Sequence, residues 1–579
     1  MTSDKKAPER ITISAYAGKG FIGAILKITG PVIDRILGIT KINHIYRSVW
    51  EKGIEKEDFV ARLLKFLKVS YHIPHGDLNR IPGTGALIIV ANHPYGGLEG
   101  IILAKVLSSI RPDVKIMANA GLKVFPELQD FFIFTNPLVT HNPRNIRSIK
   151  NCREHLENGG LLLFFPAGKV AYYRKEKKRI TDGHWNRIAA HLSTDLNIPV
   201  LPIFISGRNS RLFIFLGTIY YRFKLLMLPR EFAKRKKETV EIRCGFPISP
   251  SLLKKKGNSR DITEFLRICT YALTPESAEI KKEALPSMPP LKERPQKSLL
   301  IDEIKLLPGN QHLVDYKEFS VYYGYKSQME NIVDDITVLR EKTFRELNEG
   351  SGKPCDTDGF DATYTHLFIW DNNNEEVIGA YRMGQTDKIE ERYLSRMFDF
   401  NKQFESETNP SLEMGRSFII SEHQKSFYGL FLLWRGIGEF CVRNPRYRKL
   451  YGTVSLSNVY NRRSISLIDR ILTPKTSPAS AKTPYKSIIH SEVLDYLDSY
   501  NLDFKDLSLL VKSTEADGKD LPILLKQYWK LGAQFYITAV DTSFLETPGL
   551  LLVVDLPNAP KSSLKMYLEE GMDNYLNFK

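Results

Sequence analysis

The chain has 579 residues, of which 42% are hydrophobic and 26% are charged. This length is too great for one hydrophobic core, and the composition excludes a chain that is disordered throughout. The five cysteines lie far apart without paired spacing, which argues against a disulfide framework and against a zinc site. We therefore expect a reduced, cytoplasmic compartment and no bound metal.

The two halves of the chain differ in charge. Residues 1–290 hold 46 Lys and Arg against 25 Asp and Glu, a net charge of +21, whereas the remaining residues carry a net charge of −5. This asymmetry predicts two functional modules. The basic module needs an acidic partner, for which anionic lipid, nucleic acid and an acidic carrier protein are all open.

Residues 1–70 are predicted to form a helical segment. Its most apolar stretch, residues 20–39, contains Lys27, Pro31, Asp34 and Arg35, and is too polar for a membrane-spanning helix. The first ten residues lack the features of a secretory signal peptide. A helix lying in the membrane interface and a helix packed on its own domain are equally open.

Residues 71–273 alternate short apolar strands with amphipathic helices, which predicts an α/β domain with a mostly parallel sheet. The strands are expected at residues 86–91, 115–118, 161–165, 200–205 and 239–244. Proline-rich residues 274–300 predict a linker to a second domain at residues 301–579. Residues 473–486 are rich in Pro, Ser and Thr and are expected to form a loop inside that domain.

The run from Asn92 to Glu99 (NHPYGGLE) follows the first of these strands, at the sheet edge where such sheets bind ligands. Two glycines allow close approach of a substrate. Glu99 can orient the His93 imidazole as a general base, which suits deprotonation of a hydroxyl that attacks a thioester. A histidine that is merely hydrogen-bonded at a strand end is the alternative.

Two further motifs follow in order, Phe164–Lys169 (FFPAGK) and Ile198–Ile203 (IPVLPI). The three motifs together resemble those of the glycerolipid acyltransferase family, over roughly residues 75–250. The longer spacing from His93 and the use of Glu99 instead of Asp resemble the hemolysin-like branch, which includes O-acyltransferases of ornithine lipid synthesis. Ala167 replaces the family's glutamate, which disfavours lysophosphatidate, favours a phosphate-free lysolipid, and leaves an inactive domain open.

This resemblance implies that His93 and Glu99 are catalytic. It also implies a substrate pocket that contains Asn92, Pro94, Gly96, Gly97, Phe165, Pro166, Gly168 and Asn209. The basic residues Arg144, Arg147 and Lys169 are candidate contacts for an acidic headgroup.

The second domain contains Glu413–Ser417 (EMGRS) on an expected strand at residues 412–419, after a hairpin that turns at residues 371–374. A helix is expected at residues 428–441. With a later block at residues 521–533, this series resembles GNAT-type N-acyltransferases, in particular those of ornithine lipid synthesis and, more distantly, acyl-homoserine-lactone synthases. The resemblance covers roughly residues 330–556 and implies a GNAT-like α+β fold.

Within this resemblance, Glu413 is expected to accept a proton from an attacking amine, directly or through water. Arg416 lies three residues along the strand and should point to the opposite face unless a bulge turns it. It is assigned to the catalytic set, with a structural Glu–Arg pair as the alternative. Arg382 is an expected substrate contact. Arg435, Gly436 and Gly438 partly match the family's Arg-x-x-Gly-x-Gly loop, which binds the pyrophosphate of a cofactor. The alternative is that these residues lie inside a helix.

The sequence thus predicts an enzyme with two acyltransferase activities. The C-terminal domain would join a 3-hydroxyacyl chain to an amino acid, ornithine or glycine, and the N-terminal domain would then acylate the 3-hydroxyl. Acyl carrier protein or coenzyme A would deliver the acyl group, no cofactor would stay bound, and the chain would contact the inner face of a bacterial membrane peripherally.

Two other functions remain open. One is a phospholipid acyltransferase acting on 1-acylglycerol-3-phosphate, with a non-catalytic GNAT-like module. The other is a nucleic-acid-binding or membrane-scaffold protein on an inactive fold. The basic runs lack the interleaved aromatic residues of a base-stacking surface, so no nucleic-acid partner is expected.

Overall fold

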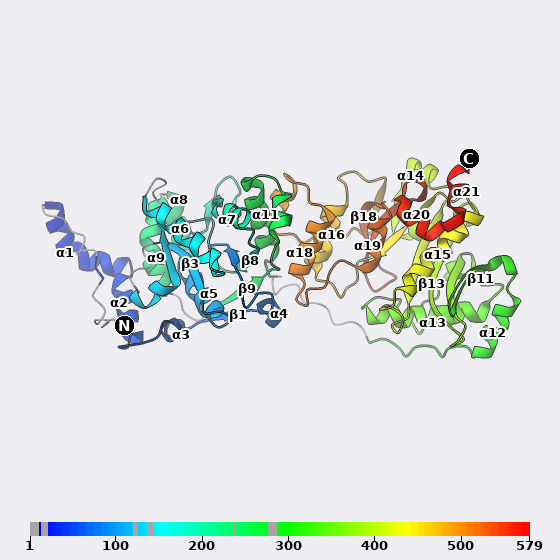
Figure 1. Ribbon diagram of the computed structural model, residues 1–579, viewed down its shortest axis with the longest axis horizontal. Helices are drawn as coiled ribbons and strands as arrows, with labels where there is room; N and C mark the ends of the chain where they lie inside the picture. The colour runs from blue at the N-terminus through cyan, green and yellow to red at the C-terminus, as the bar shows by residue number, and fades with distance from the viewer. Residues whose placement is uncertain are drawn as a thin grey trace. The chain divides into compact units, whose positions relative to one another are not determined.

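A computed structural model describes residues 11–12, 21–119, 125–135, 143–219, 221–234, 238–275 and 287–578, without the side chains of residues 21–27, 143–145 and 221–223. The chain divides into two compact units (Figure 1). Unit 1 comprises Met1–Ala278, His490–Asn501 and Lys512–Lys519, and unit 2 comprises Glu279–Ile489, Leu502–Val511 and Asp520–Lys579. The two short returning pieces of unit 1 fall within residues that the sequence analysis assigned to the second domain.

The sheet of unit 1 has the strand order β1-β9-β8-β2-β5-β3-β4. Neighbouring strands are parallel, except that β8 and β9 are antiparallel. Its strands are β1 (Val69–His72), β2 (Leu87–Ala91), β3 (Val114–Asn119), β4 (Phe132–Thr135), β5 (Leu161–Phe164), β8 (Val200–Ile205) and β9 (Glu238–Cys244). Every residue of β2, β5 and β8 is buried, which explains their unbroken apolar runs. The predicted strands and the mostly parallel sheet are confirmed.

Helices surround this sheet and the core that it shares with α3 and α5. The helices are α1 (Phe21–Ile36), α2 (Ile39–Val49), α3 (Lys56–Leu67), α4 (His75–Leu78), α5 (Leu98–Ser108), α6 (Pro143–Glu157), α7 (Ile188–Leu196), α8 (Arg211–Ile219), α9 (Tyr221–Lys234), α10 (Pro250–Lys254), α11 (Ser259–Ala272) and α17 (Ser491–Leu497), with the 3-10 helix η3 (Pro126–Phe131). A hairpin of β6 (Tyr172–Arg174) and β7 (Arg179–Thr181) contains the basic run at residues 174–179. Among the described residues, no helix combines the length and apolarity needed to cross a membrane.

The returning pieces are held to unit 1 by polar contacts. Glu492 of α17 is buried and forms ion pairs with Lys177, Arg179 and Arg267, at 2.9–3.0 Å. Burial disfavours the charged carboxylate, but these three cations outweigh that effect and lower the pKa of Glu492 to about 2. Arg80 donates to the carbonyl oxygens of Ser513 and Glu515 in the second piece.

The sheet of unit 2 has the strand order β10-β11-β12-β13-β15-β16-β19-β18. Neighbours are antiparallel, except that β15 and β16 are parallel. Its strands are β10 (His312–Tyr316), β11 (Phe319–Tyr325), β12 (Thr365–Asp371), β13 (Glu376–Gln385), β15 (Leu412–Ile419), β16 (Lys449–Ser455), β18 (Gln534–Asp541) and β19 (Thr547–Asp555). The predicted hairpin turn between β12 and β13 is confirmed.

The remaining elements of unit 2 are mainly helices. They are α12 (Lys297–Leu306), α13 (Glu330–Glu346), α14 (Lys402–Glu407), α15 (Tyr428–Arg443), α16 (Arg462–Leu472), α18 (Phe504–Thr514), α19 (Ile523–Lys530), α20 (Lys561–Leu568) and α21 (Met572–Asn577), with the 3-10 helices η4 (Gly309–Gln311), η5 (Gly359–Ala362), η6 (Tyr393–Arg396), η7 (Leu556–Asn558) and η8 (Glu569–Gly571). Helix α13 packs on β13 and β15, and α15 packs on β10 to β13. The predicted loop at residues 473–486 contains a short strand, β17 (Ala479–Ala481), which pairs with β14 (Phe398–Phe400).

Candidate active sites

The turn between β2 and α5 places His93 at the carboxyl end of the sheet. Asn92 fixes the start of this turn, because its side chain donates to the carbonyl oxygen of Ile205 at 2.8 Å and accepts from the amide of the same residue at 2.7 Å. Asn209 fixes its middle by donating to the carbonyl oxygens of Pro94 and Tyr95, each at 3.2 Å. Asn92 and Asn209 therefore hold the turn in place. Neither of them lines the cavity beside His93, and Pro94 does not line it either.

Glu99 lies in the first turn of α5 and is completely buried. Its carboxylate accepts hydrogen bonds from the amides of Tyr95, Gly96 and Gly97 at 2.9–3.1 Å. Its Oε1 also lies 2.7 Å from Nδ1 of His93. The six-residue spacing between the two residues is thus accommodated by a turn that closes around the carboxylate.

Gly96 makes this turn feasible. Its φ of 102° lies in a region that L side chains rarely adopt, and a Cβ there would lie 2.7 Å from Val170 Cγ2 and 2.8 Å from Leu228 Cδ2. The glycine is therefore required by both backbone conformation and packing.

The protonation of His93 is controlled by its carboxylate neighbour. Burial favours neutral imidazole, but the Glu99 charge and contact outweigh burial and raise the pKa of His93. The pKa of Glu99 is lowered, because His93 and the turn amides outweigh the burial of the carboxylate. An ionised Glu99 facing Nδ1 leaves Nε2 as the nitrogen that can accept a proton from a substrate.

A second carboxylate beside His93 was missed by the sequence analysis. Asp182 is fully buried, and its Oδ1 accepts a hydrogen bond from the His93 amide at 3.2 Å while Oδ2 accepts from Trp185 Nε1 at 3.0 Å. Burial is the largest influence and raises the pKa of Asp182. Asp182 follows β7, 89 residues after His93, so no local spacing pointed to it.

A cavity of about 360 Å³ opens beside His93. The predicted residues that line it are His93, Gly96, Gly97, Phe165, Pro166, Gly168 and Lys169. The ring of Phe165 stacks on the imidazole with a centroid distance of 4.8 Å. Ala167 lines the same wall, so the position of the family's glutamate contributes no charge there.

Arg147, one of the two predicted headgroup arginines, does not line this cavity. Arg147 is exposed on α6 and lines a separate depression with Lys115 and His155. The structure therefore places Arg147 outside the cavity beside His93, and its contact with an acidic headgroup stays a prediction. The side chain of Arg144 lies outside the described residues.

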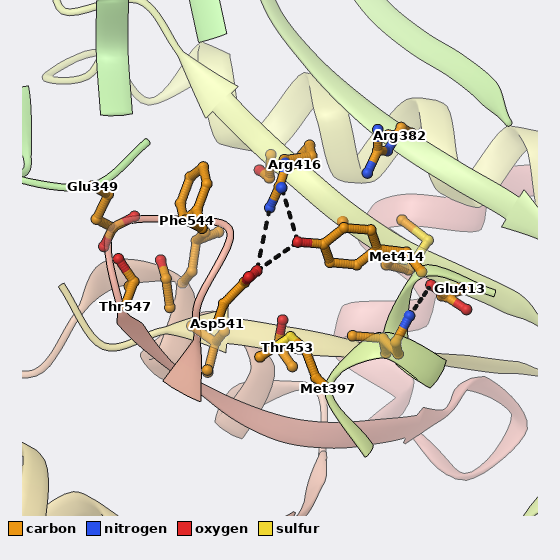
Figure 2. Close-up of a pocket in the computed structure, with 18 of the residues that line it drawn as sticks. Glu349, Arg382, Met397, Glu413, Met414, Arg416, Thr453, Asp541, Phe544 and Thr547 are labelled. Atoms are coloured by element: carbon orange, nitrogen blue, oxygen red, sulfur yellow. Dashed lines mark hydrogen bonds and ion pairs between the residues drawn. The ribbon is translucent and has the colours of Figure 1, made fainter. Parts of the chain in front are cut away.

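In unit 2, β15 and β16 pair only from Leu412 to Met414, and then diverge. A cavity of about 70 Å³ lies at this divergence, lined by Met414–Ser417 of β15 and Thr453–Ser455 of β16 (Figure 2). The pairing of β13 with β15 shifts register at the same place, and Arg416 has a φ of 52°. This bulge is the exception that the sequence analysis allowed, and it places Arg416 on the cavity wall together with Glu413.

Glu413 is 2% exposed, and its carboxylate is held by three donors. Oε1 accepts from the Tyr364 hydroxyl at 3.1 Å and from the Leu394 amide at 3.0 Å, and Oε2 accepts from the Tyr451 hydroxyl at 3.1 Å. Burial raises the pKa of Glu413, although these donors oppose the shift. The residue thus anchors η6 and two buried tyrosines, a structural contribution that the sequence alone did not assign.

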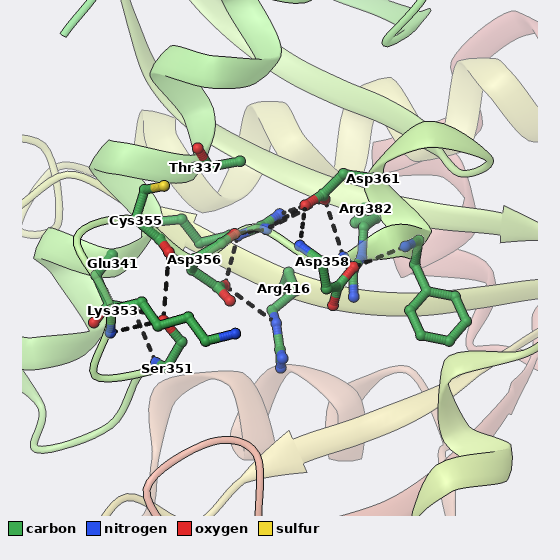
Figure 3. A network of polar contacts seen from close by, with 12 residues as sticks. Thr337, Glu341, Ser351, Lys353, Cys355, Asp356, Asp358, Asp361, Arg382 and Arg416 are labelled. Atoms are coloured by element: carbon green, nitrogen blue, oxygen red, sulfur yellow. Dashed lines mark hydrogen bonds and ion pairs between the residues drawn. The ribbon is translucent and has the colours of Figure 1, made fainter. Parts of the chain in front are cut away.

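Arg416 and Arg382 belong to a buried network of alternating charges (Figure 3). Arg416 Nε lies 3.2 Å from Asp356, and Arg382 donates to Asp358 at 2.6 Å and to Asp361 at 3.0 Å. Arg340 completes the network through Asp356 and Asp361, at 2.7 and 3.2 Å.

The network holds both predicted arginines in place. Burial disfavours their charge, but the facing carboxylates outweigh it and raise the pKa of Arg382 and of Arg416. Arg416 also donates to the Tyr393 hydroxyl at 2.9 Å, and Tyr393 in turn donates to Asp541 at 2.5 Å (Figure 2).

Glu349 is a further carboxylate of this cavity that the sequence analysis missed. It follows α13 in a loop and is 1% exposed. Burial raises the pKa of Glu349 to about 7, against smaller opposing effects of Ser455, Ser457 and the Arg416 charge. No motif marks it in the sequence.

The predicted pyrophosphate loop lies in the interior of α15. Arg435 donates to the Tyr567 carbonyl oxygen at 2.9 Å and pairs with Glu569. A Cβ on Gly436 would lie 2.6 Å from Val321, and one on Gly438 would lie 2.2 Å from the Tyr567 carbonyl oxygen. These glycines permit close helix packing, and their amides serve the helix, so the expected phosphate cradle is wrong.

Two protein-family models match the chain. The model described as Acyltransferase matches residues 27–278, and the model described as Acetyltransferase (GNAT) domain matches residues 339–435. The first contains the His93 cavity, and the second contains Glu349, Arg382, Glu413 and Arg416.

Curated relatives and a solved structure are also similar to the chain. A glycine N(alpha)-acyltransferase of Phocaeicola vulgatus is 29% identical over 257 residues, which is 39% of this chain and 77% of the relative. A lyso-glycine lipid O-acyltransferase of the same species is 24% identical over 223 residues, which is 37% of this chain and 77% of the relative. The 1-acyl-sn-glycerophosphate acyltransferase structure from Thermotoga maritima covers 43% of this chain and 89% of its own, at 15% identity and a TM-score of 0.27. The chain is an acyltransferase with an acyltransferase domain in its N-terminal half and a GNAT domain in its C-terminal half.

Proposed function

We propose that the chain makes a diacylated aminolipid in two steps. Unit 2 joins a 3-hydroxyacyl group to the amino group of a small amino acid, and unit 1 then acylates the 3-hydroxyl of that product. The observation that carries this proposal is the presence, in one chain, of two separate cavities that each hold candidate groups for acyl transfer. The two relatives, one named for N-acylation of glycine and one for O-acylation of a lyso-glycine lipid, favour glycine over ornithine as the amino acid.

The His93 pair suits the second step. Nε2 of His93 takes the proton of the lysolipid hydroxyl, and the oxygen of that hydroxyl bonds to the thioester carbonyl carbon. The carbon–sulfur bond then breaks, and the imidazolium returns the proton to the leaving thiolate. Glu99 stabilises the imidazolium during this exchange, because its buried carboxylate lies 2.7 Å from Nδ1. The absence of the family's glutamate at Ala167 is consistent with an acceptor that carries no phosphate.

We propose an acyl thioester of acyl carrier protein or coenzyme A as the donor for both steps. We also propose peripheral contact with the cytoplasmic face of a membrane. Ile28, Val32 and Ile36 are 79%, 61% and 56% exposed and recur at four-residue spacing on α1, which forms an apolar stripe that suits a lipid interface. Phe215 and Ile219 of α8 add further exposed apolar area.

Lipid mass spectra from a bacterial host that lacks aminolipids test the proposed function. The host expresses the wild type, His93→Ala, or the control His191→Ala, whose histidine is exposed on α7. We expect a new diacyl aminolipid in the wild type and the control. In His93→Ala it should fall by about 10²–10⁴-fold and be replaced by the monoacyl form.

The mass of the product identifies the amino acid. Absence of any new aminolipid from all strains, despite soluble protein and supplied 3-hydroxyacyl carrier protein, would overturn N-acylation. Acylation of lysophosphatidate without an amino acid would then support the phospholipid acyltransferase alternative.

A further inference from the structure

The cavity of unit 2 is lined by three carboxylates, and two of them already accept hydrogen bonds from the protein. Glu413 accepts three hydrogen bonds, and Asp541 accepts from the Tyr393 hydroxyl and from the amide and hydroxyl of Ser543. The third is Glu349, whose Oε1 is buried and has no hydrogen-bond partner among the described residues. The sequence motif therefore points to a carboxylate whose two oxygens already accept hydrogen bonds from the protein.

A second polar atom in the same wall is also without a partner among the residues that the structure describes. It is Oγ1 of Thr547, which is 2% exposed. Figure 2 shows Glu349 and Thr547 at the same end of the cavity, beside Phe544. Burial of an oxygen atom without a donor is unfavourable, so two such atoms together indicate a place for a ligand that supplies N–H groups.

We propose that Glu349 and Thr547 bind the amino group of the acyl acceptor, and that Glu349 removes its proton. This inference rests on the proposed N-acylation and deepens it by assigning the amine site. An alkylammonium group has three donors and no acceptor, which complements two unpaired oxygens. Glu349 thus takes the role that the sequence motif suggested for Glu413.

The bound ammonium gives one proton to Glu349 and becomes a nucleophilic amine. Its nitrogen bonds to the carbonyl carbon of the acyl thioester, the carbon–sulfur bond breaks, and the second nitrogen proton is lost as the amide forms. The leaving thiolate takes up one of the two released protons, and the other passes to solvent.

The surroundings of Glu349 set the pH at which it can act. Arg416 faces it from β15, Asp541 lies at the end of β18, and Ser455 and Ser457 approach from β16 and the loop after it. Burial raises its pKa to about 7, so the carboxyl becomes ionised and able to accept a proton as the pH rises through neutrality.

Steady-state kinetics of the full-length protein test this assignment, with glycine and a 3-hydroxyacyl thioester as substrates. The variants are Glu349→Gln and Thr547→Val, and the matched control is Glu346→Gln, an exposed glutamate at the end of α13. We expect Glu349→Gln to lower kcat by about 10²–10⁴-fold and to abolish the acidic limb of the pH profile near pH 7. Thr547→Val should raise the KM for glycine roughly tenfold with little change in kcat.

Hydroxylamine provides a chemical control, because it is unprotonated at neutral pH and needs no base. It should restore most of the rate of Glu349→Gln. A rate and pH profile of Glu349→Gln that match those of the wild type would overturn the inference, as would an equal loss of rate with glycine and with hydroxylamine. Absence of N-acylation in the wild type would instead overturn the proposed function, so the two failures are distinguishable.

Thermal unfolding of unit 2 tests the ionisation of Glu349 without any substrate. A carboxyl with a raised pKa binds more protons in the folded state, so its contribution to stability is present at low pH and is lost as the pH rises through about 7. The melting temperature of Glu349→Gln should be closest to that of the wild type at about pH 4, where the carboxyl starts to ionise only in the unfolded state, and should exceed it at pH 8. Equal melting temperatures at both pH values would show that Glu349 is not a buried titrating carboxyl.

Discussion

In unit 1, the charged pair beside the cavity comes from a single turn, His93 to Glu99, and one partner is a histidine whose pKa is raised by the carboxylate beside it. In unit 2, the charges that border the cavity come from four segments far apart in the chain, and most of them are permanently paired arginines and aspartates. A short local motif can therefore supply chemistry in one site and structural support in another. The hydrogen bonds and ion pairs of each carboxylate show whether its role is chemical or structural.

The largest expected effect, on the stability of unit 2, follows from breaking its buried network of arginines and aspartates. Arg340 is 1% exposed and contacts both Asp356 and Asp361, so Arg340→Met leaves two buried carboxylates with fewer partners. We expect a loss of about 3–5 kcal/mol in the stability of unit 2, together with its N-acylation. Hydrogen exchange measured by mass spectrometry resolves the two units.

Lys342→Met is the matched control, because Lys342 is exposed on the same helix. Unit 1 should keep its protection and its O-acylation in both variants. Unchanged protection of unit 2 in Arg340→Met would show that the network contributes little to the fold.

An intermediate effect on activity is expected when the pair of His93 and Glu99 is broken. Glu99→Gln removes the charge that raises the pKa of His93, so that pKa should fall. The acidic limb of O-acylation should move to lower pH, because His93 stays neutral to lower pH, and kcat should fall about 10²-fold as the imidazolium loses its partner. The pH dependence of kcat/KM for a lysolipid measures both changes, and an unmoved limb would contradict the assigned pair.

The smallest effect is expected from Arg147→Ala. Arg147 lies outside the His93 cavity, so O-acylation should change by less than about twofold. Lys169→Ala, at a residue that lines the cavity, should raise the KM for the lysolipid roughly tenfold. Titration of the lysolipid in both variants compares them, and a larger effect of Arg147 would place the headgroup outside the cavity.

Much of the fold could be predicted from the sequence. The apolar runs of β2, β5 and β8 were recognisable because these strands are buried on both faces. The pairing of His93 with Glu99 was also predictable, because both residues belong to one short turn.

Other parts of the sites depend on contacts between distant residues. Asp182 contacts His93 although 89 residues separate them in the chain, and Glu349 and Thr547 line one cavity although they come from distant segments. The bulge that turns Arg416 depends on the register of β13, which its own strand does not reveal. Local patterns therefore identified the turn of unit 1 and missed Glu349, the carboxylate of the unit 2 cavity that has an unpaired oxygen.

The returning pieces of unit 1 have a practical consequence for the gene. A fragment that ends in the proline-rich region after residue 275 would lack Glu492, and Lys177, Arg179 and Arg267 would lose their shared counter-charge. It would also lack the carbonyl oxygens that Arg80 binds. We expect such a fragment to be poorly soluble, so point substitutions in the intact open reading frame are the better way to study each activity alone.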